Sequence, residues 1–188
     1  MRKCAICDST NFKEVLGFDK FIFSDGSKIN YPLIKEECQF CGTIRTKLQI
    51  KLEDFYKNSY KPSRSMDTIA LMNNENVQRS QFIYKWVTDL IPENILNNFD
   101  SMLEIGCGQG YLLEKFNVPC KYGIEPNREA SKIASNKIVN IRNIGYEDIG
   151  YCEKYDFVLS YCVVEHVENP KEFLQKSFSV LNGGGLCA

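Results

Sequence analysis

Two groups of residues could do chemistry, and the first is a glycine loop flanked by carboxylates. Glycine occupies three alternate positions, Gly106, Gly108 and Gly110. Such a loop lets the backbone pass close to a ligand, because no Cβ atom obstructs the approach. Glu104 precedes the loop, and Glu125 stands nineteen residues beyond its first glycine. A carboxylate at that spacing can accept both ribose hydroxyls of a nucleotide, so the pattern predicts a nucleotide-like cofactor.

Four cysteines form the second group. They fall into two CxxC pairs, Cys4 with Cys7 and Cys38 with Cys41. Both thiolates of a pair can reach one ion while the backbone N–H groups between them point at the sulfurs, and two pairs complete a tetrahedral zinc site. With four thiolates the site has no open position for catalysis, so we expect a structural Zn²⁺. Redox use of one pair and free buried thiols are the alternatives.

The composition is that of an ordinary globular protein. Hydrophobic residues make up 44% and charged residues 25% of 188 residues, and the net charge of -1 gives no general attraction to nucleic acid or to an anionic membrane. No apolar stretch reaches the length of a membrane span, and residues 1–3 lead into a cysteine pair instead of a signal-peptide core. We expect a cytoplasmic protein, a compartment in which nine cysteines favour metal over disulfides.

The elements that must position the glycine loop alternate between strands and helices. Strands are expected at 102–105, 121–125, 138–144 and 155–161, with a fifth beginning at 185; helices are expected at 79–91, 111–116, 127–136 and from 170 to the glycines at 183–185. This alternation predicts an α/β fold, a Rossmann-like parallel sheet with crossovers on both faces. Trp86, in the first of these helices, is expected in the core.

Three segments are expected: a zinc-binding domain at 1–50, a helical connector at 51–100 and a partial Rossmann-like domain at 101–188. The connector carries Tyr56 and Tyr60, which either close over the cofactor as a lid or pack as ordinary surface aromatics. A sheet that ends at its fourth strand, with only the first residues of a fifth, would leave a long apolar edge. We therefore expect either a truncated product or self-association through that edge.

The glycine loop resembles a known family. The segment EIGCGQG has Tyr111 where a dinucleotide fingerprint needs its third glycine, and it resembles motif I of the class I S-adenosylmethionine-dependent methyltransferases. The passage from Asp156 to Gly185 resembles the same family in the region after its fourth strand. With Glu125 included, the resemblance covers residues 101–185. It implies an S-adenosylmethionine-dependent enzyme with a small-molecule methyl acceptor.

The resemblance also implies a set of site residues. The expected cofactor-binding residues are Glu104, Gly106, Gly108, Gly110, Glu125, Glu147, Asp148 and Tyr161. Glu147 and Asp148 enter this set because the turn after the third strand contacts the adenine in this family. His166, the sole histidine, follows the fourth strand, where it either acts as a catalytic base or caps the next helix.

The order of the domains gives a narrower resemblance and leaves two rivals. Cysteine pairs ahead of the methyltransferase loop look like the sugar C-methyltransferases with an N-terminal zinc-binding domain, which act on nucleotide-linked deoxysugars. In that group the residues proposed as catalytic base lie in a C-terminal part that has no counterpart here. A non-catalytic zinc-containing binding module, or an inactive truncated methyltransferase, is one alternative. A nicotinamide-dependent enzyme is the other, although it needs a glycine at Tyr111.

Overall fold

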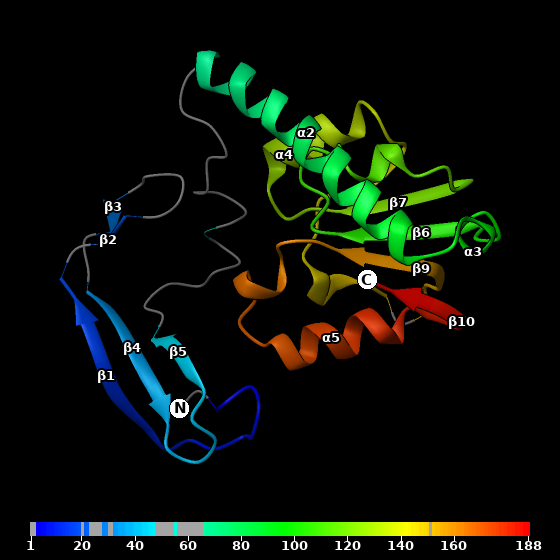
Figure 1. Ribbon diagram of the computed structural model, residues 1–188. Helices are drawn as coiled ribbons and strands as arrows, with labels where there is room; N and C mark the ends of the chain where they lie inside the picture. The colour runs from blue at the N-terminus through cyan, green and yellow to red at the C-terminus, as the bar shows by residue number, and fades with distance from the viewer. Residues whose placement is uncertain are drawn as a thin grey trace.

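The computed structural model describes residues 3–19, 21–22, 28–29, 32–47, 55, 66–150 and 152–188. Figure 1 shows a small antiparallel sheet, coloured blue to cyan, beside a larger α/β unit coloured green to red. The expected lid residues Tyr56 and Tyr60 lie outside the described part of the chain. No helix within that part is both long and apolar enough to cross a membrane.

The larger unit is built on a parallel sheet. Its strands are β6 (Ser101–Ile105), β7 (Cys120–Ile124), β8 (Asn140–Arg142), β9 (Tyr155–Ser160) and β10 (Leu181–Cys187), in the spatial order β10-β9-β6-β7-β8. All four neighbouring pairs run parallel, which confirms the predicted sheet. The chain moves outward from β6 through β7 to β8 and then returns to the other side of β6. The sheet therefore has a switch point between β6 and β9.

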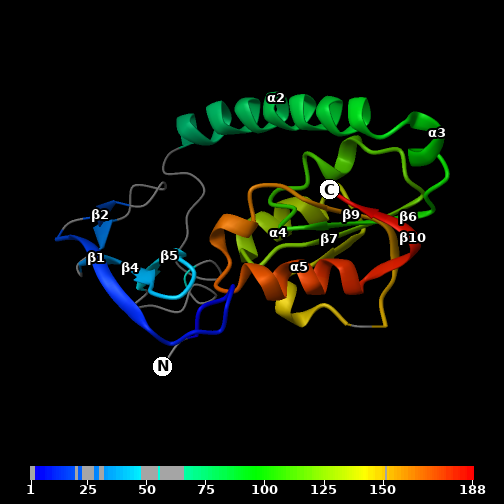
Figure 2. The same cartoon turned by 60° about the horizontal axis from the view of Figure 1, so that its bottom comes forward.

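Helices cover both faces of this sheet (Figure 2). They are α2 (Met66–Leu90), α3 (Glu93–Leu96), α4 (Arg128–Ser135) and α5 (Pro170–Ser179), with 3-10 turns η2 (Leu113–Lys115), η3 (Tyr146–Asp148) and η4 (Val164–His166). On one face Ile83 and Val87 of α2 pack with Met102 of β6, and on the other Phe173 of α5 packs with Leu103. Crossovers on both faces are thus confirmed.

Two helices begin where the sequence predicts. The Asn127 side chain accepts a hydrogen bond from the backbone N–H of Ala130 at 2.9 Å, which caps α4. The Asn169 side chain accepts one from the N–H of Glu172 at 3.2 Å, and Pro170 is the first residue of α5. Both caps fix the points at which the chain turns away from the carboxyl ends of the strands.

The prediction of a helix after the glycine loop is wrong. Only the single 3-10 turn η2 forms there. Nine residues separate Gly110 from β7, and Pro119 forces the residue before it into an extended conformation. The apolar residues of this segment enter the core from that turn and from the chain next to it, where Leu113 and Phe116 are buried.

The expectation of a core tryptophan is also wrong. Trp86 is 53% exposed, and its helical neighbours Phe82 and Leu90 are 70% and 64% exposed. The helix carries two apolar stripes about 100° apart, and only the stripe of Ile83 and Val87 faces the sheet. Packing against a single layer buries one stripe and leaves the other at the surface.

The glycine run at 183–185 does not end a helix. Helix α5 ends at Ser179, and the glycines lie inside β10. The register between β10 and β9 shifts between Leu181 and Leu186, so the glycines occupy an irregular stretch of the edge strand. Among the apolar residues of α5, Phe173 is buried, whereas Leu174 and Phe178 are exposed.

The residues of the small unit that the structure describes form very little apolar core. Strands β1 (Phe12–Phe18), β4 (Leu33–Cys38) and β5 (Ile44–Lys47) form an antiparallel sheet in the order β1-β4-β5, and β2 (Phe21–Ile22) pairs with β3 (Lys28–Ile29). Leu16 and Phe18 are exposed, whereas Cys4 and Cys38 are buried. A sheet this small needs a further constraint to hold its shape.

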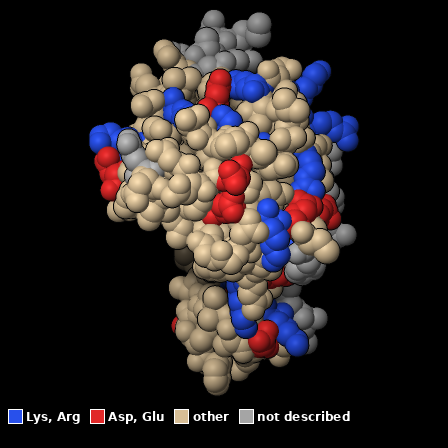
Figure 3. Space-filling view, turned by 90° about the vertical axis from the view of Figure 1, so that its right-hand side faces the viewer, with Lys and Arg blue, Asp and Glu red and all other residues tan. Residues whose placement is uncertain are grey.

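Acidic and basic side chains are interspersed on the face that Figure 3 shows, and no large area of a single sign stands out there. This distribution agrees with the net charge of -1.

Candidate functional site

The carboxyl ends of β6, β7 and β9 meet at the switch point of the sheet, and the glycine loop leaves β6 there (Figure 1). Open α/β sheets bind ligands in the crevice at such a point, because the loops on its two sides turn in opposite directions. One cavity of about 1850 Å³ lies at this edge. The larger unit forms one of its walls and the small antiparallel sheet contributes the other.

All three glycines of the loop have positive φ, at 75°, 53° and 78° for Gly106, Gly108 and Gly110. A Cβ atom on Gly106 would overlap the side chain of Val163, and one on Gly110 would lie 3.2 Å from the Cβ atom of Ala134. A Cβ atom on Gly108 would meet no atom within 4 Å. Packing thus requires the outer two glycines, whereas the middle one faces open space in the cavity.

Glu125 holds the loop in this shape. One carboxylate oxygen accepts the N–H of Gly108 at 2.9 Å, and the other accepts the N–H of Asn127 at 2.8 Å. The Asn143 amide donates to the Glu125 carbonyl at 2.8 Å and fixes the backbone as well. Burial raises the pKa of the Glu125 carboxyl, and the two N–H donors act in the opposite direction. Each oxygen keeps a further lone pair with which it can accept a ligand hydroxyl.

Glu104 is buried beneath the loop, with 3% of its surface exposed. Its Oε2 atom has no hydrogen-bond partner among the residues that the structure describes, although it lines the cavity. Burial raises the pKa of the Glu104 carboxyl to about 8, and the nearby charge of Glu125 acts in the same direction. A hydrogen bond from the Leu113 backbone lowers the pKa but does not offset the burial. Without a ligand this carboxyl is therefore mostly protonated at neutral pH.

The turn after β8 brings one of its two candidate carboxylates to the cavity. Glu147 lines the cavity, whereas Asp148 and Gly110 are not among the described residues that line it. The two carboxylates lie in the same 3-10 turn, η3. Glu147 is the member of the pair that stands where a cofactor could reach it.

Tyr161 lines the cavity just beyond β9, and an arginine of α2 contacts it. Arg79 Nε donates to the Tyr161 hydroxyl at 3.4 Å, and the guanidinium carbon lies 5.3 Å from the centre of the tyrosine ring. The sequence reasoning did not single out Arg79. Its spacing of four residues from the buried Ile83 was the available signal, since residues at i and i+4 share a helix face.

His166 also lines the cavity, from the 3-10 turn η4. Its backbone N–H donates to the Val163 carbonyl at 2.8 Å, and Glu165 and Glu168 of the same segment also line the cavity. The side chain is exposed. The structure thus brings the candidate base to the same cavity as the glycine loop.

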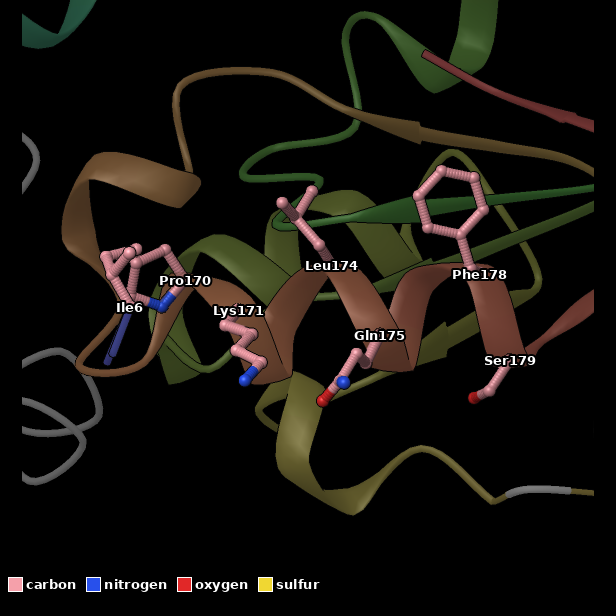
Figure 4. A pocket seen from close by; sticks show the side chains of 7 residues that line it. All are labelled: Ile6, Pro170, Lys171, Leu174, Gln175, Phe178 and Ser179. Atoms are coloured by element: carbon pink, nitrogen blue, oxygen red, sulfur yellow. The ribbon is translucent and has the colours of Figure 1, made fainter. Parts of the chain in front are cut away.

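A second, shallower hollow of about 710 Å³ runs along α5. Figure 4 shows Leu174 and Phe178 projecting from one side of the helix, Lys171 and Gln175 from the other, and Ile6 of the small unit near one end. Its single ionisable side chain, Lys171, offers no acid–base pair. The candidate cofactor-binding and catalytic residues line the larger cavity and not this hollow.

The four CxxC cysteines come together in the small unit. Their Sγ atoms all lie within 4.8 Å of one another, at 3.7 Å for Cys4 and Cys41 and 3.5 Å for Cys7 and Cys38. Four thiolates around one Zn²⁺ lie about 3.8 Å apart, given Zn–S bonds of about 2.3 Å. The Cys41 backbone N–H lowers the pKa of the Cys38 thiol to about 6. The donor set and its spacing fit zinc.

The comparison with protein families assigns the larger unit. A family described as a methyltransferase domain matches residues 75–188, more than half of the chain. The chain belongs to this methyltransferase family. The match begins inside α2, so this helix is part of the methyltransferase domain together with the sheet that it covers.

Relatives of this methyltransferase chain include proteins of defined and undefined activity. It is 36% identical over 107 residues to an uncharacterized protein of Methanocaldococcus jannaschii, with 56% of this chain and 50% of the relative covered. It is 34% identical over 95 residues to the ubiquinone biosynthesis O-methyltransferase of Nitrobacter winogradskyi, with 46% and 36% covered. The chain thus spans half or less of the length of these relatives.

Solved methyltransferase structures share the fold. The magnesium protoporphyrin IX methyltransferase of Synechocystis, with bound SAM, superposes with a TM-score of 0.52 at 14% identity, covering 73% of this chain and 75% of its own. Streptomyces venezuelae DesVI superposes with a TM-score of 0.52 at 18% identity, and the match covers 68% of this chain and 57% of DesVI. The plantazolicin methyltransferase BpumL, in complex with SAH, superposes with a TM-score of 0.50 at 20% identity, and the match covers 70% of this chain and 53% of BpumL. At these identities the likeness establishes the fold alone.

Proposed function

We propose that this protein binds S-adenosylmethionine and transfers its methyl group to a small molecule. The observation that carries the proposal is the middle glycine of the loop, Gly108, which faces open space while Glu125 holds its N–H. A nucleoside fits there because bare backbone and a carboxylate meet at the switch point. The buried, unpaired oxygen of Glu104 on the same wall suits the cationic part of such a cofactor.

Each wall residue would hold one part of the cofactor. Glu125 would accept the ribose hydroxyls with its remaining lone pairs, and Glu147, which also lines the cavity, would contact the adenine. When bound, the cofactor supplies an electrophilic methyl group on its sulfonium. The protein must then align a nucleophile with that methyl group and keep water away.

The candidate proton acceptor for the nucleophile is His166. An imidazole can act as a general base and remove a proton from a hydroxyl or an acidic carbon. The imidazole lies on the cavity rim, where it is accessible to an acceptor entering from solvent. This position supports a role as catalytic base.

We further propose that the acceptor carries a phosphate, as a nucleotide-linked sugar does. Three cations of the small sheet line the opposite wall of the cavity, and two of them are neutralised: Arg45 pairs with Glu36 and Lys47 with Glu14, both at 2.7 Å. Lys35 donates instead to the neutral hydroxyl of Thr46, at 2.7 Å. Its positive charge therefore stays available to an anionic acceptor.

We also propose that the four-cysteine cluster binds a structural Zn²⁺. The proposal is supported by the spacing of the sulfur atoms and by the exposure of Leu16 and Phe18, which leaves little apolar burial in the described part of the small sheet. The ion would hold the β4–β5 wall of the cavity in place.

Titration calorimetry tests the cofactor. The protein should bind S-adenosylhomocysteine and show no binding of NAD, and Glu125→Ala should weaken the first affinity by about 5- to 150-fold, as the loss of a hydrogen-bonding buried carboxylate does. Glu129→Ala, an exposed carboxylate on the next helix, is the matched control and should leave the affinity unchanged. Equal affinities for Glu125→Ala and the parent protein would reject the ribose role.

The phosphate proposal has its own test. Thymidine diphosphate should bind to the protein loaded with S-adenosylhomocysteine, and Lys35→Gln should weaken this binding. Lys13→Gln, an exposed lysine of the same sheet that does not line the cavity, serves as control. If both variants bind the diphosphate as the parent does, Lys35 is not part of the acceptor site.

A further inference from the structure

Helix α2 carries a row of large apolar side chains on its outer surface. Phe82, Trp86 and Leu90 follow one another at intervals of four residues, so they form a single ridge along the helix. Their exposed fractions are 70%, 53% and 64%. In Figure 2 the helix lies across the top of the larger unit, with the sheet beneath it. The ridge therefore lies outside the core that Ile83 and Val87 of the same helix enter.

The apolar area of this ridge is that of an interaction surface. A large aromatic side chain presents about 150 to 250 Å² when it is fully accessible, so the three partly exposed side chains together offer about 350 Å². Contiguous apolar patches of about 300 to 600 Å² are the largest on a typical monomer and are often functional. Two such ridges, together with the polar residues beside them, reach the roughly 1,000 Å² that a specific protein–protein interface buries. A second copy of this chain therefore fits the area.

The row of residues beside the ridge carries charges of both signs. Lys85 and Asp89 lie about one turn apart on α2, and the lysine Nζ atom lies 2.8 Å from the nearer carboxylate oxygen. Their side chains are 71% and 59% exposed, so each can also contact a neighbouring molecule. The lysine comes first along the helix and the aspartate second.

An antiparallel pair of α2 helices matches this order of charges. With a two-fold axis at Trp86, the two indoles meet at the axis and Phe82 of each copy lies against Leu90 of the other. The helix of the second copy runs in the opposite direction, so its Asp89 lies beside Lys85 of the first. The symmetry repeats this contact on the other side of the axis. Opposite charges therefore meet twice along the flank of the ridge.

We propose that two copies of this chain associate through the ridge of Phe82, Trp86 and Leu90 as an antiparallel helix pair. Trp86 is the central aromatic residue, of the kind that supplies most of the binding free energy of an interface. The charged flank fixes the direction of the pairing. None of the three ridge residues lines the cavity, so the association does not depend on the proposed function.

Sedimentation equilibrium of the full chain measures the association. Between about 1 and 100 μM the parent protein should change from single copies to dimers, the range expected at the low end of interface sizes. Trp86→Ser should raise the dissociation constant by about 30-fold or more. Phe178→Ser removes an exposed aromatic side chain of α5 and is the matched control, which should leave the dissociation constant unchanged. Thermal melting establishes that each variant is folded.

Two charge variants test the antiparallel arrangement. Lys85→Asp gives each copy two aspartates on the flank of the ridge, and Asp89→Lys gives each copy two lysines. Either variant alone should associate about 3- to 30-fold more weakly than the parent, because like charges then meet twice. An equimolar mixture of the two variants should form dimers as readily as the parent does, since each aspartate of one copy then meets a lysine of the other.

The proposal is overturned if the parent protein remains a single copy at about 100 μM. It is also overturned if Trp86→Ser associates as the parent does, because the dimer then uses another surface, such as the edge of β10. Loss of the dimer in Phe178→Ser would assign the interface to α5 instead. If the mixture of the two charge variants stays dissociated, the helices are not antiparallel partners.

Discussion

The burial of Glu104 predicts how the stability of the ligand-free protein depends on pH. Its pKa is about 8 in the folded state and about 4.5 in an unfolded chain. Between these values the folded protein holds a proton that the unfolded chain has released, so stability falls as the pH rises through this window. The contribution is fully present below pH 4.5 and is lost above pH 8.

The size of the effect follows from the two pKa values. At about 1.4 kcal/mol per pKa unit, the difference corresponds to at most about 5 kcal/mol over the whole window, and to about 3 kcal/mol between pH 5.5 and 8. Glu104→Gln removes the titration while keeping the shape of the side chain. Relative to the parent, the variant should therefore gain about this much stability as the pH rises.

Urea unfolding followed by circular dichroism at several pH values from 5.5 to 8.5 measures the difference between the two proteins. Protonation of the zinc-site thiols affects both in the same way and cancels in that difference. Glu129→Gln, at an exposed site, is the control and should run parallel to the parent. If the curve of Glu104→Gln also runs parallel to that of the parent, Glu104 does not titrate near pH 8 and the reasoning from its burial is refuted.

Four other changes test the site and the fold. Gly106→Ala should destabilise the protein, because the added Cβ atom would overlap the side chain of Val163, whereas Gly108→Ala should cost only about 1 to 2 kcal/mol of backbone strain and should chiefly weaken the binding of S-adenosylhomocysteine. Thermal melting measures the first effect and titration calorimetry the second. Equal melting temperatures for the two variants would contradict the packing described for Gly106. His166→Asn should lower kcat by about 100-fold or more with cofactor affinity unchanged, and unaltered kcat would exclude it as the base. Metal analysis should find about one zinc per chain, whose removal by a chelator should unfold the small sheet; a fully folded zinc-free protein would contradict the site.

The features that the sequence predicts correctly are local ones. The starts of α4 and α5 are predicted correctly because a cap such as Asn127 or Asn169 needs only its own side chain and a backbone N–H three residues away. The parallel sheet follows from the alternation of strands with helices. The glycine loop and Glu125 come together because the ends of neighbouring parallel strands share one edge.

The features that the sequence does not predict depend on packing between distant segments of the chain. A helical pattern with two apolar stripes does not say which stripe meets the sheet, so Trp86 is misplaced. Arg79 and Tyr161 are 82 positions apart, and no spacing rule connects them. The segment after Gly110 has helical apolar spacing, yet the distance to the next strand leaves room for one turn only. In each case the tertiary environment decides among local possibilities.

The outward position of Trp86 has a practical consequence, since it is the sole tryptophan of the chain. A half-hydrated indole emits at long wavelength already in the native state, so intrinsic fluorescence should change little when the domain denatures. The same property makes the indole a sensitive reporter for anything that comes to lie on the outer surface of α2. A blue shift on adding another macromolecule would identify that surface as covered, without any label having been attached.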